Sequence, residues 1–123
     1  MSSPKTIFCD LDGTLTKHPG SGFSTILQDP DHRLELLPGV KEFLMKIDKE
    51  RYHLVITTGR KESGREATIK QLQKAGILYD QLIMGFGGGD RILINDRKLN
   101  SDRDTAYVIN VDRNKGLIDE NSI

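Results

Sequence analysis

The sequence predicts an α/β fold, a doubly wound (Rossmann-like) parallel sheet of about five strands. Apolar runs alternate along the chain with amphipathic helical segments, which is the pattern of a parallel sheet covered by helices on both faces. Several of these runs stop abruptly at polar residues, as buried strands do where they leave a sheet. The length of 123 residues is that of one domain, which we expect to span residues 1–123.

The predicted strands are short apolar runs at residues 6–9, 52–57, 82–84, 91–94 and 107–111. A helix is expected where apolar residues recur at the spacing of one helical face, at Val40, Phe43, Leu44 and Ile47. A second helix is expected from about Glu62, and Gly76 is placed to end it. Residues 15–38 keep no period and are rich in glycine and proline, so we expect a loop or flap there.

Composition narrows the class of protein. The 18 Lys and Arg residues balance the 18 Asp and Glu residues, so an electrostatically driven nucleic-acid binder is not expected. The single cysteine, Cys9, cannot form an internal disulfide. The sequence has no apolar stretch of membrane-spanning length and no apolar signal segment at its start. We therefore expect a cytoplasmic protein with no membrane partner and no nucleic-acid partner.

The motif with the clearest chemistry is Asp10-Leu11-Asp12-Gly13-Thr14, directly after the first apolar run. An ionised carboxylate can attack phosphorus and form an aspartyl-phosphate, which splits hydrolysis into two steps. A second carboxyl two residues later can protonate the leaving oxygen and then deprotonate water. Glycine permits the turn between them and a close approach of backbone N–H groups to phosphate. The alternative is an acidic turn with local side-chain hydrogen bonds.

This D-x-D-G-T motif, followed by Leu15-Thr16, resembles the haloacid dehalogenase (HAD) superfamily of phosphotransferases. The resemblance implies that Asp10 is the nucleophile and Asp12 the general acid and base. It also implies a Mg²⁺ cofactor held by Asp10 and by Asp12, whose backbone carbonyl would reach the ion. Family members usually owe their specificity to a cap domain, and residues 15–38 are too short for one. We therefore expect a HAD-like core without a cap domain.

Two further strand ends match motifs of this family. Thr58-Gly59-Arg60 resembles the second motif, in which the Thr58 hydroxyl and the Gly59 N–H would hold phosphate and Arg60 would add a contact. On its own, this tripeptide would be read as a helix N-cap. Asp96, after the fourth predicted strand, resembles the acidic fourth motif and would complete the magnesium site, since Mg²⁺ binds oxygen ligands.

The third motif is where this sequence departs from the family, because Phe86 follows Gly85 where a lysine is expected. A cation is physically required, since two carboxylates and a phosphate dianion would repel one another. Lys98 is the preferred substitute and the fourth phosphate-binding residue of the prediction. The alternatives are Arg91, Lys61 and Arg60.

The resulting hypothesis is a magnesium-dependent phosphatase that hydrolyses a small phosphorylated metabolite. A sugar phosphate is preferred, because the sequences around residues 94–98 and 108–117 resemble small family members associated with surface-sugar biosynthesis. A bare core needs shielding from water, so we also expect a homo-oligomer. The alternative is a non-catalytic phosphate- or partner-binding domain on the same scaffold, and a signalling receiver domain ranks last.

Overall fold

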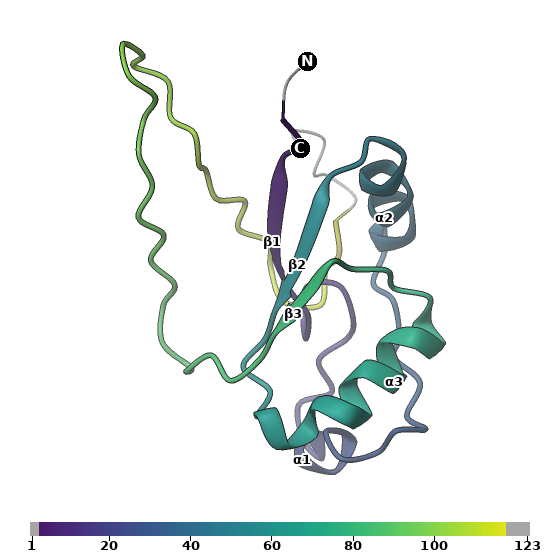
Figure 1. The fold of residues 1–123 in the computed structure, drawn as a ribbon. Coiled ribbons are helices and arrows are strands. Elements are labelled where there is room, and N and C mark those ends of the chain that lie inside the picture. Colours follow the sequence, from purple (N-terminus) through teal and green to yellow (C-terminus); the bar gives the residue numbers. More distant parts are fainter. Residues whose placement is uncertain (1–2, 118–123) are drawn as a thin grey trace.

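The computed structural model describes residues 3–117 and contains three strands and three α-helices within that range (Figure 1). In chain order the elements are β1 (Thr6–Asp10), α1 (Phe23–Ile26), α2 (Val40–Lys49), β2 (His53–Thr57), a 3-10 turn η1 (Glu62–Gly64), α3 (Arg65–Ala75) and β3 (Gln81–Ile83).

The strands form one parallel sheet in the order β1-β2-β3. In its register Cys9 pairs with Ile56, and Ile56 with Leu82. Asp10 pairs with Thr57, so the ends of β1 and β2 lie side by side at the carboxyl edge of the sheet. The predicted α/β fold with a parallel sheet is thereby confirmed, and polar groups from separate parts of the chain meet at one edge.

The hydrophobic core lies on one face of this sheet. Alternate strand residues point to the same face, and Cys9, Leu54 and Ile56 from β1 and β2 share a buried cluster with residues of both long helices. The helical members of that cluster are Val40, Phe43, Ile47 and Leu72. The opposite face leaves Phe8 58% and Ile83 38% exposed. Within the described chain, therefore, helix α2 and helix α3 pack on one face of the sheet, where the doubly wound pattern predicted cover on both.

The two predicted helices are confirmed. Helix α2 buries the apolar face that its spacing predicted, with charged residues such as Lys41 and Lys49 outside. Helix α3 follows the 3-10 turn at Glu62–Gly64, so the helical segment begins where the sequence suggested. It ends at Gly76, whose φ of 72° lies in the left-handed region that glycine adopts without strain.

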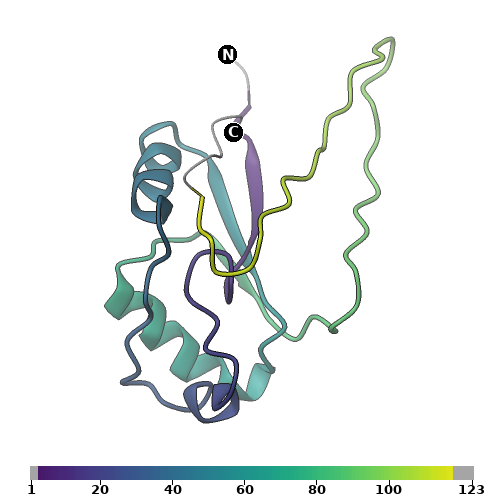
Figure 2. The same cartoon turned by 180° about the vertical axis from the view of Figure 1, so that it is seen from behind.

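The fourth and fifth predicted strands are not formed. Residues 88–110, which we name the excursion, leave the body of the molecule as an extended segment without strand pairing (Figures 1 and 2). Ile92 and Ile94 are 86% and 91% exposed, and Tyr107 is 62% exposed. An apolar run shows that a segment is suited to burial, but a strand also needs a partner edge. The order β1-β2-β3 leaves one edge of β1 unpaired in the described sheet, and neither run joins it.

The structure bears on the expected absence of a membrane span and on the expected domain boundaries only within the described residues. No helix among residues 3–117 has the length and apolar character required to cross a membrane. The predicted domain boundaries, 1–123, extend past the described residues and stay a prediction.

We expect Leu72→Ala to lower the free energy of unfolding by about 2–5 kcal/mol, because Leu72 is fully buried in the core cluster and its loss leaves a cavity. Leu78→Ala is the matched control, since Leu78 is 75% exposed and its truncation should change stability by about 0.5 kcal/mol or less. Urea unfolding measures both values. Equal losses in the two variants would contradict the placement of α3 on the core.

Candidate active site

The D-x-D-G-T loop is a tight turn built on the buried residue Leu11. The Leu11 carbonyl accepts hydrogen bonds from the N–H groups of Thr14, Leu15 and Thr16, at 2.9–3.2 Å. Gly13 has a φ of +90°, and a Cβ placed there would lie 3.1 Å from Cγ of Arg113. The backbone conformation therefore favours glycine at this position, and a Cβ there would require the exposed Arg113 side chain to shift.

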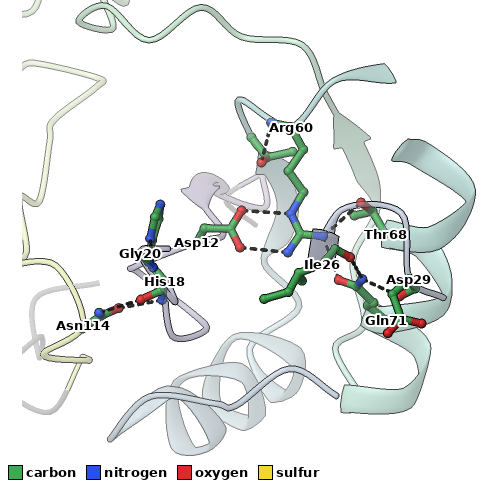
Figure 3. A network of polar contacts seen from close by, with 10 residues as sticks. Asp12, His18, Gly20, Ile26, Asp29, Arg60, Thr68, Gln71 and Asn114 are labelled. Carbon is green, nitrogen blue, oxygen red and sulfur yellow. Dashed lines mark hydrogen bonds and ion pairs between the residues drawn. The ribbon is translucent and has the colours of Figure 1, made fainter. Parts of the chain in front are cut away.

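A distant part of the chain braces this loop. The Asn114 N–H donates to the Gly13 carbonyl at 2.8 Å. The Asn114 side chain pairs with the backbone of His18, accepting from its N–H at 2.7 Å and donating to its carbonyl at 3.0 Å (Figure 3). Sequence reasoning missed Asn114, because no local pattern shows which backbone groups an asparagine in a loop will reach.

Asp10, the predicted nucleophile, lies at the end of β1. Its carboxylate accepts a hydrogen bond from the Thr14 hydroxyl at 3.4 Å. Partial burial raises the pKa of Asp10 above its ordinary value, and repulsion from Asp12 acts in the same direction. A hydrogen bond from the Leu11 N–H, the charge of Arg91 and the Thr14 hydroxyl oppose this rise in the pKa.

Asp12, the predicted acid and base, is held by Arg60. Both carboxylate oxygens accept from the guanidinium group, Oδ2 from Nε at 2.9 Å and Oδ1 from Nη2 at 2.8 Å (Figure 3). The Arg60 side chain is 1% exposed and the Asp12 side chain 10% exposed. This is a bidentate, largely buried ion pair, the geometry in which arginine gives the most orientation to a carboxylate.

The second-motif residues lie next to this pair. Thr58 is buried, and its hydroxyl oxygen accepts the Arg60 N–H at 3.1 Å, which leaves the hydroxyl hydrogen available to donate. Gly59 is exposed, and a Cβ at that position would lie 3.3 Å from the Phe86 carbonyl oxygen. The Thr58 side chain therefore forms a local turn with the Arg60 N–H and caps no helix, since the next helical element begins at Glu62 with Lys61 before it. Its role toward phosphate stays a prediction.

The structure separates the candidate cations. Arg60 is committed to Asp12, and Lys61 is exposed after β2. Lys98 lies exposed in the excursion. Arg91 packs over the Phe86 ring at 5.1 Å and donates to the carbonyls of Gly87 and Gly89, while its charge lowers the pKa of Asp10. Arg91 is exposed near the start of the excursion, and it is the candidate whose charge acts on the Asp10 carboxylate in this structure.

Asp96 is not brought to the other predicted ligands. It lies in the excursion, which runs away from the carboxyl edge of the sheet (Figure 1). There its carbonyl accepts a hydrogen bond from the Thr105 hydroxyl, and a neighbouring ion pair joins Arg97 to Asp104 at 2.9 Å. The role of Asp96 as a ligand stays a prediction that depends on the path of residues 88–110.

Without Asp96, two of the predicted oxygen ligands for a magnesium ion remain at the end of β1. The Asp10 carboxylate and the Asp12 backbone carbonyl lie on one loop, and a cation between them and a phosphate would offset the repulsion acting on Asp10. Among residues 3–117, no three side chains of His, Cys, Asp or Glu gather as a metal-binding group. Mg²⁺ usually keeps several waters and binds one or two carboxylates, so a site of this size is sufficient to begin its coordination.

Cys9 takes no part in this chemistry. It is buried in the core beside the loop, and burial followed by the charge of Asp10 raises the pKa of its thiol to about 12. A thiol is nucleophilic as its thiolate, so this cysteine is a small apolar core residue.

Comparison with known proteins places this site in a family. Residues 7–99 match the family described as haloacid dehalogenase-like hydrolase. No curated protein sequence matches the chain. A chain from the structure of the Pnkp1/Rnl/Hen1 complex is 31% identical with a TM-score of 0.58, over 74% of this chain and 31% of its own length.

Two further solved structures are similar. A chain of the Pnkp1/Rnl/Hen1 RNA repair complex is 29% identical with a TM-score of 0.56, over 81% of this chain and 28% of its own. A target protein from Vibrio cholerae is 25% identical with a TM-score of 0.51, over 77% of this chain and 82% of its own. The chain thus spans about a third of the length of the RNA repair proteins that it matches. By the match over residues 7–99, it belongs to the haloacid dehalogenase-like hydrolase family.

Proposed function

We propose that this hydrolase is a magnesium-dependent phosphatase that acts on a small phosphomonoester through an aspartyl-phosphate. The observation that carries the proposal is the pair of carboxylates on the Asp10–Asp12 loop, which have different surroundings. Asp12 is locked to Arg60, whereas the Asp10 carboxylate has a single side-chain hydrogen bond, from Thr14, among the described residues. One carboxylate is therefore available to attack, and the other is oriented for proton transfer.

The two steps follow from these positions. In the first, an Asp10 oxygen bonds to phosphorus while the ester P–O bond breaks, and the leaving oxygen takes that electron pair together with the proton of a protonated Asp12. In the second, the ionised Asp12 accepts a proton from water as the water oxygen attacks phosphorus, and the P–O bond to Asp10 breaks, which frees phosphate and restores the Asp10 carboxylate. A magnesium ion on Asp10 and the Asp12 carbonyl would supply positive charge against the phosphoryl oxygens.

The transferred phosphoryl group also needs donors from the protein. The Thr58 hydroxyl retains its hydrogen for donation, and the exposed backbone at Gly59 admits a close approach. The proposed cation is Arg91, whose charge acts on Asp10, and the alternative is Lys98, which the sequence preferred.

A sugar phosphate is the proposed substrate, on the resemblance of residues 94–98 and 108–117 to family members associated with surface-sugar biosynthesis. The relatives in an RNA repair complex make a phosphorylated RNA end the appropriate comparison substrate. The zero formal net charge of the chain favours the small metabolite. A homo-oligomer and a cytoplasmic location complete the proposal.

Asp10→Asn should reduce turnover of a phosphomonoester panel in Mg²⁺ by at least about 10³-fold, because an amide cannot form the acyl-phosphate. Asp48→Asn, at an exposed position on α2, is the matched control and should keep wild-type turnover. Release of inorganic phosphate measures both. Undiminished turnover in Asp10→Asn would rule out the mechanism.

Wild-type protein that binds phosphate but turns over no member of that panel would favour the non-catalytic binding domain. The panel should include sugar phosphates and a short RNA with a terminal phosphate, each with Mg²⁺ and with chelator.

Arg91→Ala should lower kcat/KM by about 10²–10³-fold, the cost of losing one charged donor at a phosphoryl site. Lys98→Ala should lower it less, since Lys98 lies further along the excursion and Arg91 is the candidate whose charge acts on Asp10. Steady-state kinetics of the two variants beside Lys49→Ala, at an exposed position on α2, decide between the cations. A larger loss in Lys98→Ala would return the role to Lys98.

A further inference from the structure

We propose that Arg60 is a positioning residue that aims the Asp12 carboxylate for its proton transfers, and that Gln71 couples this support to residues 23–29. This inference rests on the proposed function, in which Asp12 is the acid and base. It replaces the phosphate contact that the sequence suggested for Arg60.

The hydrogen bonds of Arg60 leave little capacity for a substrate. Two of them go to Asp12, one from Nη1 to the Thr68 hydroxyl oxygen at 3.1 Å and one from Nη1 to the Gln71 oxygen at 2.8 Å. A guanidinium group has five N–H donors, so four of the five are in use. The side chain is also 1% exposed, so a phosphate would have to displace these partners to reach it.

The same contacts define the orientation of Asp12. Two parallel N–H donors fix both the position and the plane of a carboxylate, which a single donor does not. Each Asp12 oxygen keeps a second position outside the contacts with Arg60, and there it would carry the proton given to the leaving oxygen and accept the proton of water. The efficiency of proton transfer depends on that alignment.

Gln71 joins this support to the segment that the sequence predicts as a flap. Its Oε1 accepts from Arg60, while its Nε2 donates to the Ile26 carbonyl at 2.7 Å and to the Asp29 carbonyl at 2.8 Å (Figure 3). The residue is fully buried, and both amide hydrogens and the amide oxygen are used. From the other side, the Phe23 ring lies 5.7 Å from the Arg60 guanidinium carbon.

The result is a continuous polar connection from residues 26–29 through Gln71 and Arg60 to Asp12. Because Gln71 and Arg60 at the centre of this connection are buried and hydrogen-bonded on both sides, a displacement at one end removes a partner at the next. Residues 23–29 therefore belong to the support of the proton-transfer group.

The test compares Arg60→Lys and Gln71→Met with Gln73→Met, an exposed glutamine on the same helix. For Arg60→Lys we expect kcat to fall about 10²-fold, the cost of a misplaced catalytic group, because lysine keeps the charge and loses the two-pronged contact. For Gln71→Met we expect a fall of about tenfold, and for Gln73→Met no change. In all three variants, KM and the Kd of inorganic phosphate should stay within about threefold of wild type.

A phosphate Kd that rises in step with the loss of kcat would overturn the inference and make Arg60 a phosphate ligand. A double-mutant cycle gives an independent readout. In an Asp12→Asn background, Arg60→Lys or Gln71→Met should cause no further loss, and an undiminished further loss would equally overturn the proposal. Circular dichroism checks that each variant is folded. If the Arg60→Lys variant does not fold, the double-mutant cycle of Gln71→Met with Asp12→Asn tests the proposal in its place. Absence of turnover in the wild type would instead contradict the proposed function, while the phosphate titration still reports on Arg60.

Discussion

The buried ion pair between Asp12 and Arg60 is the interaction on which the site depends. Charges removed from water are costly unless each is paired and hydrogen-bonded. That requirement accounts for Thr68 and Gln71, two polar residues that are fully buried on α3. A buried ion pair is weak evidence for stability, since apolar residues of similar size often do as well. Its value here lies in orientation.

The parallel register of β1 and β2 provides the second constraint. It sets Asp10 opposite Thr57, so the carboxylate loop and the Thr58-Gly59-Arg60 turn begin at the same level of the sheet. Arg60 then reaches back across this edge to Asp12. Two motifs separated by 48 residues act as one site because two strands share a register.

Most of this arrangement follows from the sequence, and the exceptions all depend on contacts between residues that lie far apart in the chain. Local patterns predicted β1, α2, β2 and α3, because periodicity and a terminal glycine act over a few residues. They did not predict that residues 91–94 and 107–111 would stay exposed, since strand formation depends on a partner edge far away in the chain. They also suggested a phosphate contact for Arg60 and did not indicate its ion pair with Asp12. Whether Arg60 binds a substrate or Asp12 depends on how deeply its side chain is buried. The sequence held a signal of that burial, because the polar residues Thr68 and Gln71 stand beside the core residues Ala67 and Leu72 on α3.

The bracing of the Asp10–Thr14 loop by Asn114 has a consequence for the order of folding. The side chain of Asn114 closes on the backbone of His18 across 96 residues, whereas β1, β2 and the helices between them make contacts of shorter range. Contacts of large sequence separation require the costliest loop closure and slow the folding of a chain. The loop of Asp10–Thr14 is therefore secured only once residues 111–117 have been synthesised and have returned to it. A nascent chain that has already formed its β1–β2 sheet still lacks this brace, so the loop is fixed later than the sheet that carries it.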